Sequence, residues 1–394
     1  MKILEYLQRY DGEPLRFMEV CGTHTAEIHR NGIPALLPPS IELVSGPGCP
    51  VCVTVSAYID RLIKLGMDEK NRIVTFGDML RVPGSRMSLS EARSLGCCVQ
   101  MVYSPMDALR LAQKDPEHIY IFAAVGFETT TPVYALLIQE ALRLGTKNLR
   151  LLTSLKVMPP VIDWICARSA APDEGQGLRR DHDSDRLQEV RGDHGSDSGP
   201  ESREIHGSAR NRVFRGNRES VRIHGFLAPG HVSVVTGSRI FVPLARKYGL
   251  PFVVAGFEGE QILGAIAALV KLRGQGRVLN MYPSAVTEEG NREAQERVER
   301  FFEPCDAAWR GMGVIPDSGR RLREEYRDFD AGSEDLTGDE GGNPACRCAQ
   351  VLTGQLHPRE CPLFGKVCTP QTPQGACMVS TEGSCFSCWQ SEGL

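Results

Sequence analysis

Short apolar runs alternate with amphipathic segments from the start of the chain to about Tyr282. Apolar runs bounded by turn residues are typical of buried strands, and apolar residues at helical spacing are typical of helices with one buried face. The runs predict about nine strands: LRFMEV, IELVSG, RIVTFG, VQMVYS, IYIFAAVG, LRLLTS, GFLAPG, PFVVAGF and RVLNMY. The segments between them predict helices: SAYIDRLIKLG, PMDALRLAQK, TPVYALLIQEALRLG, SRIFVPLARKYG and EQILGAIAALVKLRG. Strand followed by helix, repeated in this way, predicts parallel sheets with helices on both faces.

About nine strands are too many for one compact half, so the pattern predicts two Rossmann-like, parallel-sheet α/β domains at residues 1–118 and 119–282. The stretches IFAAVGFETTTP and PFVVAGFEGEQI hint at an internal repeat, because each is an apolar strand that ends in Gly-Phe-Glu before a helix. The segment 170–221 holds one aromatic residue and almost no aliphatic ones. We expect a disordered insertion there, because such a segment cannot bury enough apolar surface to offset its ordering entropy.

The alternation stops beyond Met281. A helical pattern over 288–302 is followed by an acidic, glycine-rich stretch and then by a cysteine-rich tail. We therefore expect residues 283–394 to form a third, smaller domain that is rich in loops.

Composition and charge narrow the choice of function. The 394 residues carry a formal net charge of −4, which argues against a nucleic-acid partner, since phosphate binding needs clustered Lys and Arg. The first residues, MKILEYLQRYDGEP, carry charges and no continuous apolar stretch, so no signal peptide is expected. The longest apolar run, LGAIAALV, is too short to cross a bilayer. The sequence therefore predicts a cytoplasmic protein without a membrane partner.

Cysteine is unusually abundant for such a chain. There are fourteen cysteines, and seven of them lie between Cys346 and Cys388. In a reducing compartment cysteines are more often metal ligands or redox thiols than static disulfides.

Residues with metal or acid–base chemistry follow several of the predicted strands. In open α/β sheets, ligands bind beyond the carboxyl ends of the strands. Such residues stand directly after, or close behind, those ends: Cys21, His24, Cys49, Cys52, Glu128, His231 and Glu258.

The motif CGTHT places a thiol and an imidazole three residues apart, and on a tight loop Cys21 and His24 can both reach one centre. Iron, zinc or copper would accept that pair of ligands. A Cys–His nucleophile pair is the enzymatic alternative. The third possibility is a buried cysteine beside a histidine that is hydrogen-bonded to backbone.

The motif GPGCPVC places Cys49 and Cys52 at the start of a predicted helix. A helix N-terminus favours the thiolate form. The spacing allows a reversible disulfide or two ligands to one metal. A zinc clamp would need a partner pair at similar spacing nearby, and the sequence has none.

The tail suggests a metal centre of its own. Fourteen, six and sixteen residues separate four of these cysteines: Cys346, Cys361, Cys368 and Cys385. Four thiolates on a glycine- and proline-rich scaffold suit a four-iron cluster or a structural zinc, and the prolines beside the cysteines favour iron–sulfur. Cys348, Cys377 and Cys388 are left over, and the spacing does not decide whether Cys346 or Cys348 is the first ligand.

Together these motifs resemble one family, the HypD-type hydrogenase maturation factors. The matching stretches occur in order: FMEVCGTHT, IELVSGPGCPVCVT, VGFETTTP, FLAPGHVSVVTG, PFVVAGFE, GMGVIPDSG and CPLFGKVCTPQTPQGACMVSTEG. The resemblance covers nearly the whole chain except the insertion. The chain departs from the usual pattern at a few positions, with Gly259 and Gln261 after the second Gly-Phe-Glu, Met281 and Ser284 in NMYPSAV, and an atypical SCFSCW end.

The resemblance implies two α/β domains facing a cleft, with a small iron–sulfur domain, and a scaffold on which the Fe(CN)2CO group of [NiFe]-hydrogenase is built. The implied partners are a small HypC-type chaperone, a HypE-type cyanide donor and, indirectly, the hydrogenase large subunit. The implied cofactors are a [4Fe-4S] cluster and the Fe(II) that carries CN and CO during assembly.

The resemblance also implies roles for individual residues. Cys21 would be an iron ligand with His24 close by, and Cys49 and Cys52 a redox pair or further iron ligands. The cluster ligands would be Cys346, Cys361, Cys368 and Cys385. Cys348 and Cys377 would form a neighbouring disulfide, as in ferredoxin–thioredoxin reductase, and Glu128, His231 and Glu258 would position groups or handle protons near the iron.

Two other interpretations stay open. A general iron–sulfur thiol–disulfide oxidoreductase would need Cys49 and Cys52 but not Cys21. A zinc-stabilised adaptor would contain no iron. An assembly scaffold, in contrast, should lose iron loading when Cys21 is replaced.

Overall fold

The computed structural model describes residues 3–170 and 222–393. The insertion expected at 170–221 falls outside the described residues except for Ala170. None of the described helices combines the length and apolar character needed to cross a membrane.

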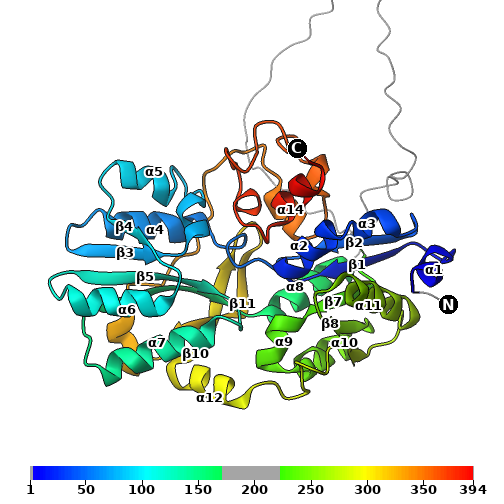
Figure 1. Ribbon diagram of the computed structural model, residues 1–394, viewed down its shortest axis with the longest axis horizontal. Helices are drawn as coiled ribbons and strands as arrows, with labels where there is room; N and C mark the ends of the chain where they lie inside the picture. The colour runs from blue at the N-terminus through cyan, green and yellow to red at the C-terminus, as the bar shows by residue number, and fades with distance from the viewer. Residues whose placement is uncertain (1–2, 171–221, 394) are drawn as a thin grey trace, which may run out of the picture.

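A five-stranded, fully parallel sheet forms one end of the elongated molecule (Figure 1). Its strand order is β2-β1-β7-β8-β9, with bounds β1 Leu15–Glu19, β2 Ile41–Ser45, β7 Gly225–Pro229, β8 Phe252–Ala255 and β9 Val278–Asn280. One face packs on α1 Ile3–Gln8, α2 Gly22–Arg30, α3 Ile33–Leu36 and α11 Gly259–Lys271. The other packs on α8 Met158–Ala170, α9 Gly230–Thr236 and α10 Val242–Tyr248.

A six-stranded sheet forms the other end. Its order is β10-β11-β6-β5-β3-β4, with bounds β3 Asn71–Thr75, β4 Val99–Met101, β5 Ile119–Gly126, β6 Leu149–Lys156, β10 Phe302–Trp309 and β11 Gly313–Leu322. Helices α6 Pro105–Lys114, α7 Thr131–Arg143 and α12 Arg292–Phe301 cover one face. Helices α4 Ser56–Gly66 and α5 Leu89–Ser94 cover the other.

Alternation along each strand explains these two-sided cores. Neighbours on one strand point to opposite faces of a sheet. Phe226 accordingly joins the core beneath α8 while Leu227 joins the core beneath α11. Both faces are apolar because helices cover both. The prediction of parallel-sheet α/β architecture is confirmed, and each of the nine predicted strands overlaps one of β1 to β9.

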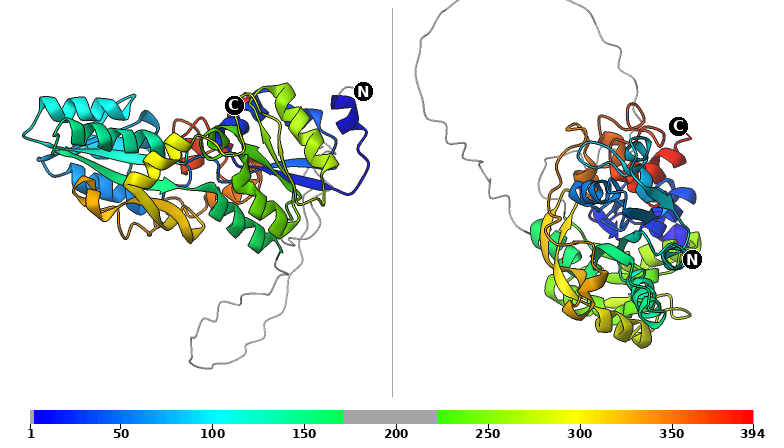
Figure 2. Two further views of the ribbon diagram at one scale, coloured as in Figure 1. Left: turned by 90° about the horizontal axis from the view of Figure 1, so that it is seen from below. Right: turned by 90° about the vertical axis from the view of Figure 1, so that its left-hand side faces the viewer.

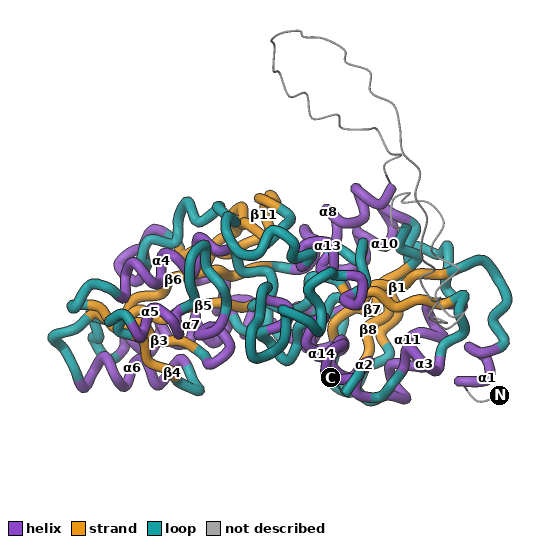
Figure 3. Tube along the Cα trace, turned by 90° about the horizontal axis from the view of Figure 1, so that it is seen from above, coloured by secondary structure: helices purple, strands orange, loops and turns teal. Residues whose placement is uncertain are grey.

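The chain crosses between the sheets more often than expected. The strands of 1–118 divide between both sheets, and those of 119–282 do so as well. The expected boundary at 118/119 therefore does not separate the two sheets. The tail segment, which holds α13 Cys348–Leu352 and α14 Ser384–Ser391, lies between the two sheets (Figures 2 and 3).

Two local expectations were wrong. Residues 302–322 lie in the part expected to be rich in loops, but they form the hairpin of β10 and β11, and β11 pairs antiparallel with β6. The CGTHT stretch is not a tight loop, because α2 begins at Gly22 and places His24 in its first turn.

Candidate functional site

Each sheet has a point where the chain reverses its direction of winding. In the five-stranded sheet β1 pairs with β2 on one side and with β7 on the other. In the six-stranded sheet β3 pairs with β4 and with β5. Ligands bind beyond the carboxyl ends of strands at such points. Cys21 and His231 follow β1 and β7, and Glu128 follows β5.

Cys21 is held in place by a buried carboxylate. Its backbone N–H donates to Glu19 Oε2 at 3.0 Å, and the hydroxyl of Thr25 donates to the other oxygen of the same group. Burial raises the pKa of Glu19 to about 7 and that of the Cys21 thiol to about 12. The thiol is therefore protonated at neutral pH until a bound cation stabilises the thiolate.

The loop that carries Cys49 and Cys52 contacts the backbone of Cys21. The N–H of Gly22 donates to Gly48 O at 3.0 Å. A Cβ at Gly48 would lie 2.3 Å from Cys21 N, so only glycine allows this approach. The two segments that the sequence singled out are thus neighbours in the fold.

Cys49 and Cys52 are joined by a disulfide, with their Cα atoms 5.2 Å apart, and both are buried. The thiols do not open a helix as expected, because α4 begins only at Ser56. A disulfide offers no thiolate, so in this state Cys21 is the free cysteine of the three. Across the residues that the structure describes, no group of three His, Cys, Asp or Glu side chains is arranged to hold a single metal ion.

His24 is completely buried, and its ring Nε2 lies 2.9 Å from Gly256 O. A carbonyl only accepts, so Nε2 carries the proton and Nδ1 presents a lone pair. Nδ1 has no hydrogen-bond partner. Burial lowers the pKa of His24 to about 4, which keeps the ring neutral. The ring of Phe257 contacts both His24, at a centroid distance of 4.7 Å, and His231, at 4.0 Å.

The two glutamates of the repeated Gly-Phe-Glu have different surroundings. Glu258 is exposed and precedes α11, where its N–H donates to Gln261 Oε1 at 3.3 Å. Glu128 accepts from Met158 N at 2.8 Å, while its other oxygen is buried without a partner. Burial raises the pKa of Glu128 to about 7. Glu128 follows β5 of the six-stranded sheet, whereas Cys21 and His24 follow β1 of the five-stranded sheet.

The tail contributes a residue that the sequence analysis did not single out. Glu382 Oε1 accepts from the hydroxyl of Thr23 at 2.9 Å, and a Cβ at Gly22 would lie 2.5 Å from Glu382 Cβ. Further along, Ser391 Oγ lies 3.3 Å from His29 Nδ1. Helices α2 and α14 therefore run side by side in the same direction, next to Cys21. Glu382 stands in the matching stretch CMVSTEG, which was the only available signal.

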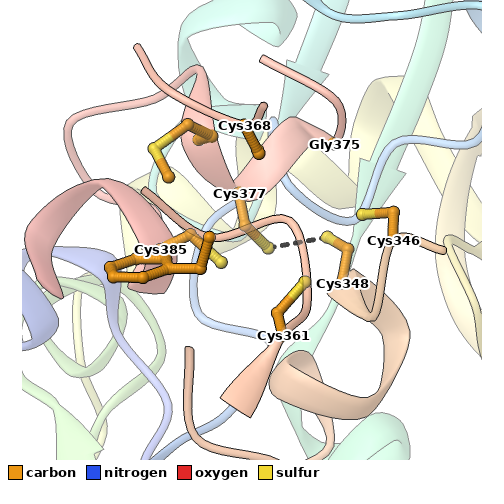
Figure 4. Close-up of a pocket in the computed structure, with 9 residues that line it drawn as sticks. Cys346, Cys348, Cys361, Cys368, Gly375, Cys377 and Cys385 are labelled. Atoms are coloured by element: carbon orange, nitrogen blue, oxygen red, sulfur yellow. Dashed lines mark hydrogen bonds between the residues drawn. The ribbon is translucent and has the colours of Figure 1, made fainter. Parts of the chain in front are cut away.

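The tail cysteines surround a cavity (Figure 4). All four cysteines expected to bind a cluster line it, together with two of the leftover cysteines: Cys346, Cys361, Cys368, Cys385, Cys348 and Cys377. A Cβ at Gly375 would lie 2.8 Å from Cys346 Sγ, so glycine keeps this wall open. The sulfurs of Cys348 and Cys377 are 2.8 Å apart as free thiols.

This donor set suits a polynuclear cluster. A structural zinc needs four sulfurs within about 2.3 Å of one point, whereas each thiolate of a four-iron cluster binds a different iron. The cysteines line one cavity, and no three of the described His, Cys, Asp or Glu side chains are arranged to hold a single metal ion, so the cysteines could hold such a cluster. Cys388 does not line the cavity; its thiol lies 3.4 Å from Glu392 Oε1.

Known proteins resemble this chain over almost its whole length. A family model described as "HypD: Hydrogenase formation hypA family" matches residues 1–176 and 211–392. The hydrogenase expression/formation protein HupD of Azotobacter chroococcum mcd 1 is 40% identical over 386 residues, which cover 96% of this chain and 89% of the relative. The hydrogenase maturation factor HypD of Azotobacter vinelandii is 39% identical over 384 residues, covering 96% and 89%. HypD of Escherichia coli strain K12 is 36% identical over 404 residues, covering 99% and 94%.

Proposed function

The chain belongs to the HypD family of hydrogenase maturation factors, and on that premise we propose that it is the scaffold on which the Fe(CN)2CO group of [NiFe]-hydrogenase is assembled. The iron and its ligands are cargo in this proposal, and Cys21 is their anchor. The observation that carries it is the setting of Cys21. This free, buried thiol lies at the winding reversal of the five-stranded sheet, beside a neutral histidine with an unused lone pair.

One protein sulfur is enough for such a cargo. Cyanide and CO are strong-field ligands that occupy several positions on low-spin Fe(II), and a soft thiolate tolerates that environment. While Cys49 and Cys52 form a disulfide, Cys21 is the ligand that this chain supplies to the iron, and a partner protein supplies any further protein ligand. We assign His24 Nδ1 the role of accepting a proton or a hydrogen bond from a ligand on the iron.

The tail holds the second centre of the proposal. Cys346, Cys361, Cys368 and Cys385 would bind a [4Fe-4S] cluster, and the cavity that they line supports this assignment over zinc. The cluster, when bound, supplies electrons one at a time. Cys348 and Cys377 lie on the same cavity and form the adjacent redox pair.

Electrons then reach the iron site through thiol–disulfide exchange. A Cys348 or Cys377 thiolate attacks the Cys49–Cys52 disulfide, and the second thiol of the donor pair resolves the mixed disulfide. One disulfide forms as the other breaks, and two protons move to the new thiols, so the exchange is balanced. The structure holds one pair oxidised and the other reduced, which is one end state of this exchange.

Family membership supports the partners. A small HypC-type chaperone would share the iron, a HypE-type protein would donate cyanide, and the hydrogenase large subunit would receive the finished group. Neither nucleic acid nor a membrane has a part in the proposal.

Anaerobic co-purification with a HypC-type chaperone, followed by infrared spectroscopy, tests the assignment. The wild-type complex should show cyanide and carbonyl stretches. Cys21→Ala should lose them, whereas Cys97→Ala, at a buried free thiol in another core, should retain them. Persistence of the bands in Cys21→Ala would rule out the anchor and favour a general iron–sulfur thiol–disulfide oxidoreductase.

A further inference from the structure

The turn of the β10–β11 hairpin lies between the two cysteine pairs. Trp309, the last residue of β10, is fully buried and belongs to the same apolar cluster as Cys49 and Cys52 and as Cys348 and Cys377. The matching stretch GMGVIPDSG covers this turn, and the proposed function gives it no role.

Arg310 binds the segment that follows Cys52. Its backbone N–H donates to Val53 O at 2.9 Å, and its Nε donates to Thr54 O at 2.6 Å. Its Nη2 donates to Pro83 O at 3.0 Å. One planar side chain thus fixes two separate loops, which the single ammonium of a lysine cannot do with the same geometry.

Gly311 contacts the residue that follows Cys348. Its φ is +72°, and a Cβ at this position would lie only 2.1 Å from Cβ of Ala349. The turn therefore packs directly against the start of α13. Two consecutive residues, Arg310 and Gly311, reach the immediate chain neighbours of one cysteine in each pair.

Asp339, in the segment before Cys346, contacts both the hairpin turn and the start of α4. Its carboxylate accepts from Ser56 N at 3.1 Å and from Gly311 N at 2.8 Å. One of its oxygens lies 3.7 Å from Arg310 Nε, and the two side chains are 27% and 13% exposed. A charge pair shielded from water to this extent holds its geometry better than a surface pair does.

We propose that Arg310 is a positioning residue that holds the Cys49–Cys52 loop and the Cys348–Cys377 pair in place for exchange between them. This role rests on the proposed function, which supplies the exchange. The Arg310 side chain donates its hydrogen bonds to the carbonyls of Thr54 and Pro83, and it is too buried to meet a partner protein. It acts through Val53 and Thr54 on one pair, and through Gly311 and Ala349 on the other.

A stepwise reduction tests this role. Anaerobic full-length protein, with its cluster and with both pairs oxidised, is mixed with dithionite, quenched with acid at intervals and alkylated, and mass spectrometry reports the disulfide at each pair. Arg310→Lys should leave the reduction of Cys348–Cys377 unchanged and slow that of Cys49–Cys52 by about tenfold to a hundredfold, the cost of small misplacements of reacting groups. Asp339→Asn should slow the same step by a smaller factor.

Arg323→Lys is the matched control, because Arg323 also donates to a backbone carbonyl, Glu299 O at 2.7 Å, but at the far end of the hairpin. It should change neither step. The role of Arg310 would be overturned if Arg310→Lys reduced Cys49–Cys52 as fast as wild type does. It would also be overturned if the variant slowed the reduction of both disulfides equally. A separate measurement tests the route itself in the Cys377→Ser protein. If Cys49–Cys52 is reduced in this variant as fast as in wild type, electrons do not pass through the Cys348–Cys377 pair and the proposed exchange fails.

Discussion

Buried polar atoms without partners mark both winding reversals at the scale of single residues. Among the described residues, His24 Nδ1 and Glu128 Oε2 belong to a set of four such side-chain atoms. A native protein seldom leaves a buried polar atom unsatisfied unless it serves a ligand or a reaction. His24 lies in the first turn of α2, directly after Cys21, and Glu128 follows β5 in the second sheet. The pair therefore points to chemistry at both sheets.

Glu128 gives a prediction about pH and stability. Its pKa is raised from 4.5 to about 7 in the folded protein, so between those values the unfolded chain binds fewer protons than the folded one. The free energy of unfolding therefore falls as the pH rises through this window. Glu128→Gln removes that loss. Above pH 7 the free energy of unfolding of the variant should exceed that of wild type by up to about 3 kcal/mol, and the difference should shrink towards pH 4.5.

Urea unfolding across that pH range measures the effect. Glu258→Gln, at the exposed glutamate of the other Gly-Phe-Glu, is the control and should stay within about 0.5 kcal/mol of wild type. A difference between Glu128→Gln and wild type that does not vary with pH would contradict the explanation by burial.

The leftover cysteine Cys388 offers a comparison for the cluster. Cys361 lines the cavity and Cys388 does not. Cys361→Ser should lose most of its iron, because removing a direct ligand costs at least the roughly tenfold to hundredfold in affinity that outer partners contribute. Cys388→Ser should keep its iron. The iron and sulfide content and the visible absorbance of the two variants are measured after anaerobic purification. If both variants retain the same amount of iron, Cys361 is excluded as a ligand.

At the scale of elements, glycines at or just after the strand ends let neighbouring segments pack closely. Gly48 lies on the backbone of Cys21, and each Gly-Phe-Glu glycine lies against the start of the next helix. A Cβ at Gly126 would be 2.5 Å from Thr130, and one at Gly256 would be 2.0 Å from Gln261. Glycine at these points lets the strand end and the helix start pack without a gap.

Gly48→Ala should therefore disturb the site more than an ordinary glycine substitution does. The added Cβ meets backbone atoms of Cys21, which cannot move aside cheaply, so we expect a loss of about 1–3 kcal/mol and weaker iron loading. Gly264→Ala in α11 is the control, since its nearest neighbour would be a flexible Met281 methyl at 3.4 Å. Thermal unfolding and iron content report both effects, and a Gly48→Ala protein as stable as the control would refute the contact.

The sequence predicted some elements and missed others for physical reasons. Continuous apolar runs made β1 to β9 visible. Strands β10 and β11 were missed because FEPCDAAW and GVIPDSGRRL carry proline, glycine and charges. The edge position of β10 tolerates such residues. Helix α2 was missed because GTHT is poor in strong helix formers, and packing against α14 and α11 stabilises it instead.

At the scale of the whole molecule, the chain interleaves its two sheets. It forms β1 and β2, crosses to build β3 to β6, returns for β7 to β9, crosses again for β10 and β11, and ends between the sheets. The strand–helix units have similar local sequence patterns, so the pattern does not show which sheet a strand joins. That depends on contacts between residues distant in sequence. The same applies to Glu382 and Arg310, whose partners lie hundreds of positions away. Cysteines at marked spacings were visible because a metal centre needs several of them.

Residues 177–210 lie where this interleaving passes from α8 to β7, and the family model matches the chain on either side of them but not there. Both sheets, the Cys21 site and the tail cavity are built from described residues outside this stretch. Replacing 177–210 by a short Gly-Ser linker should therefore leave the unfolding temperature within a few degrees of wild type, as expected for changes within about 0.5 kcal/mol. Infrared bands of the chaperone complex should also persist at wild-type intensity. Loss of those bands with an unchanged unfolding temperature would mean that the stretch takes part in assembly, and the scaffold proposed above would then be incomplete.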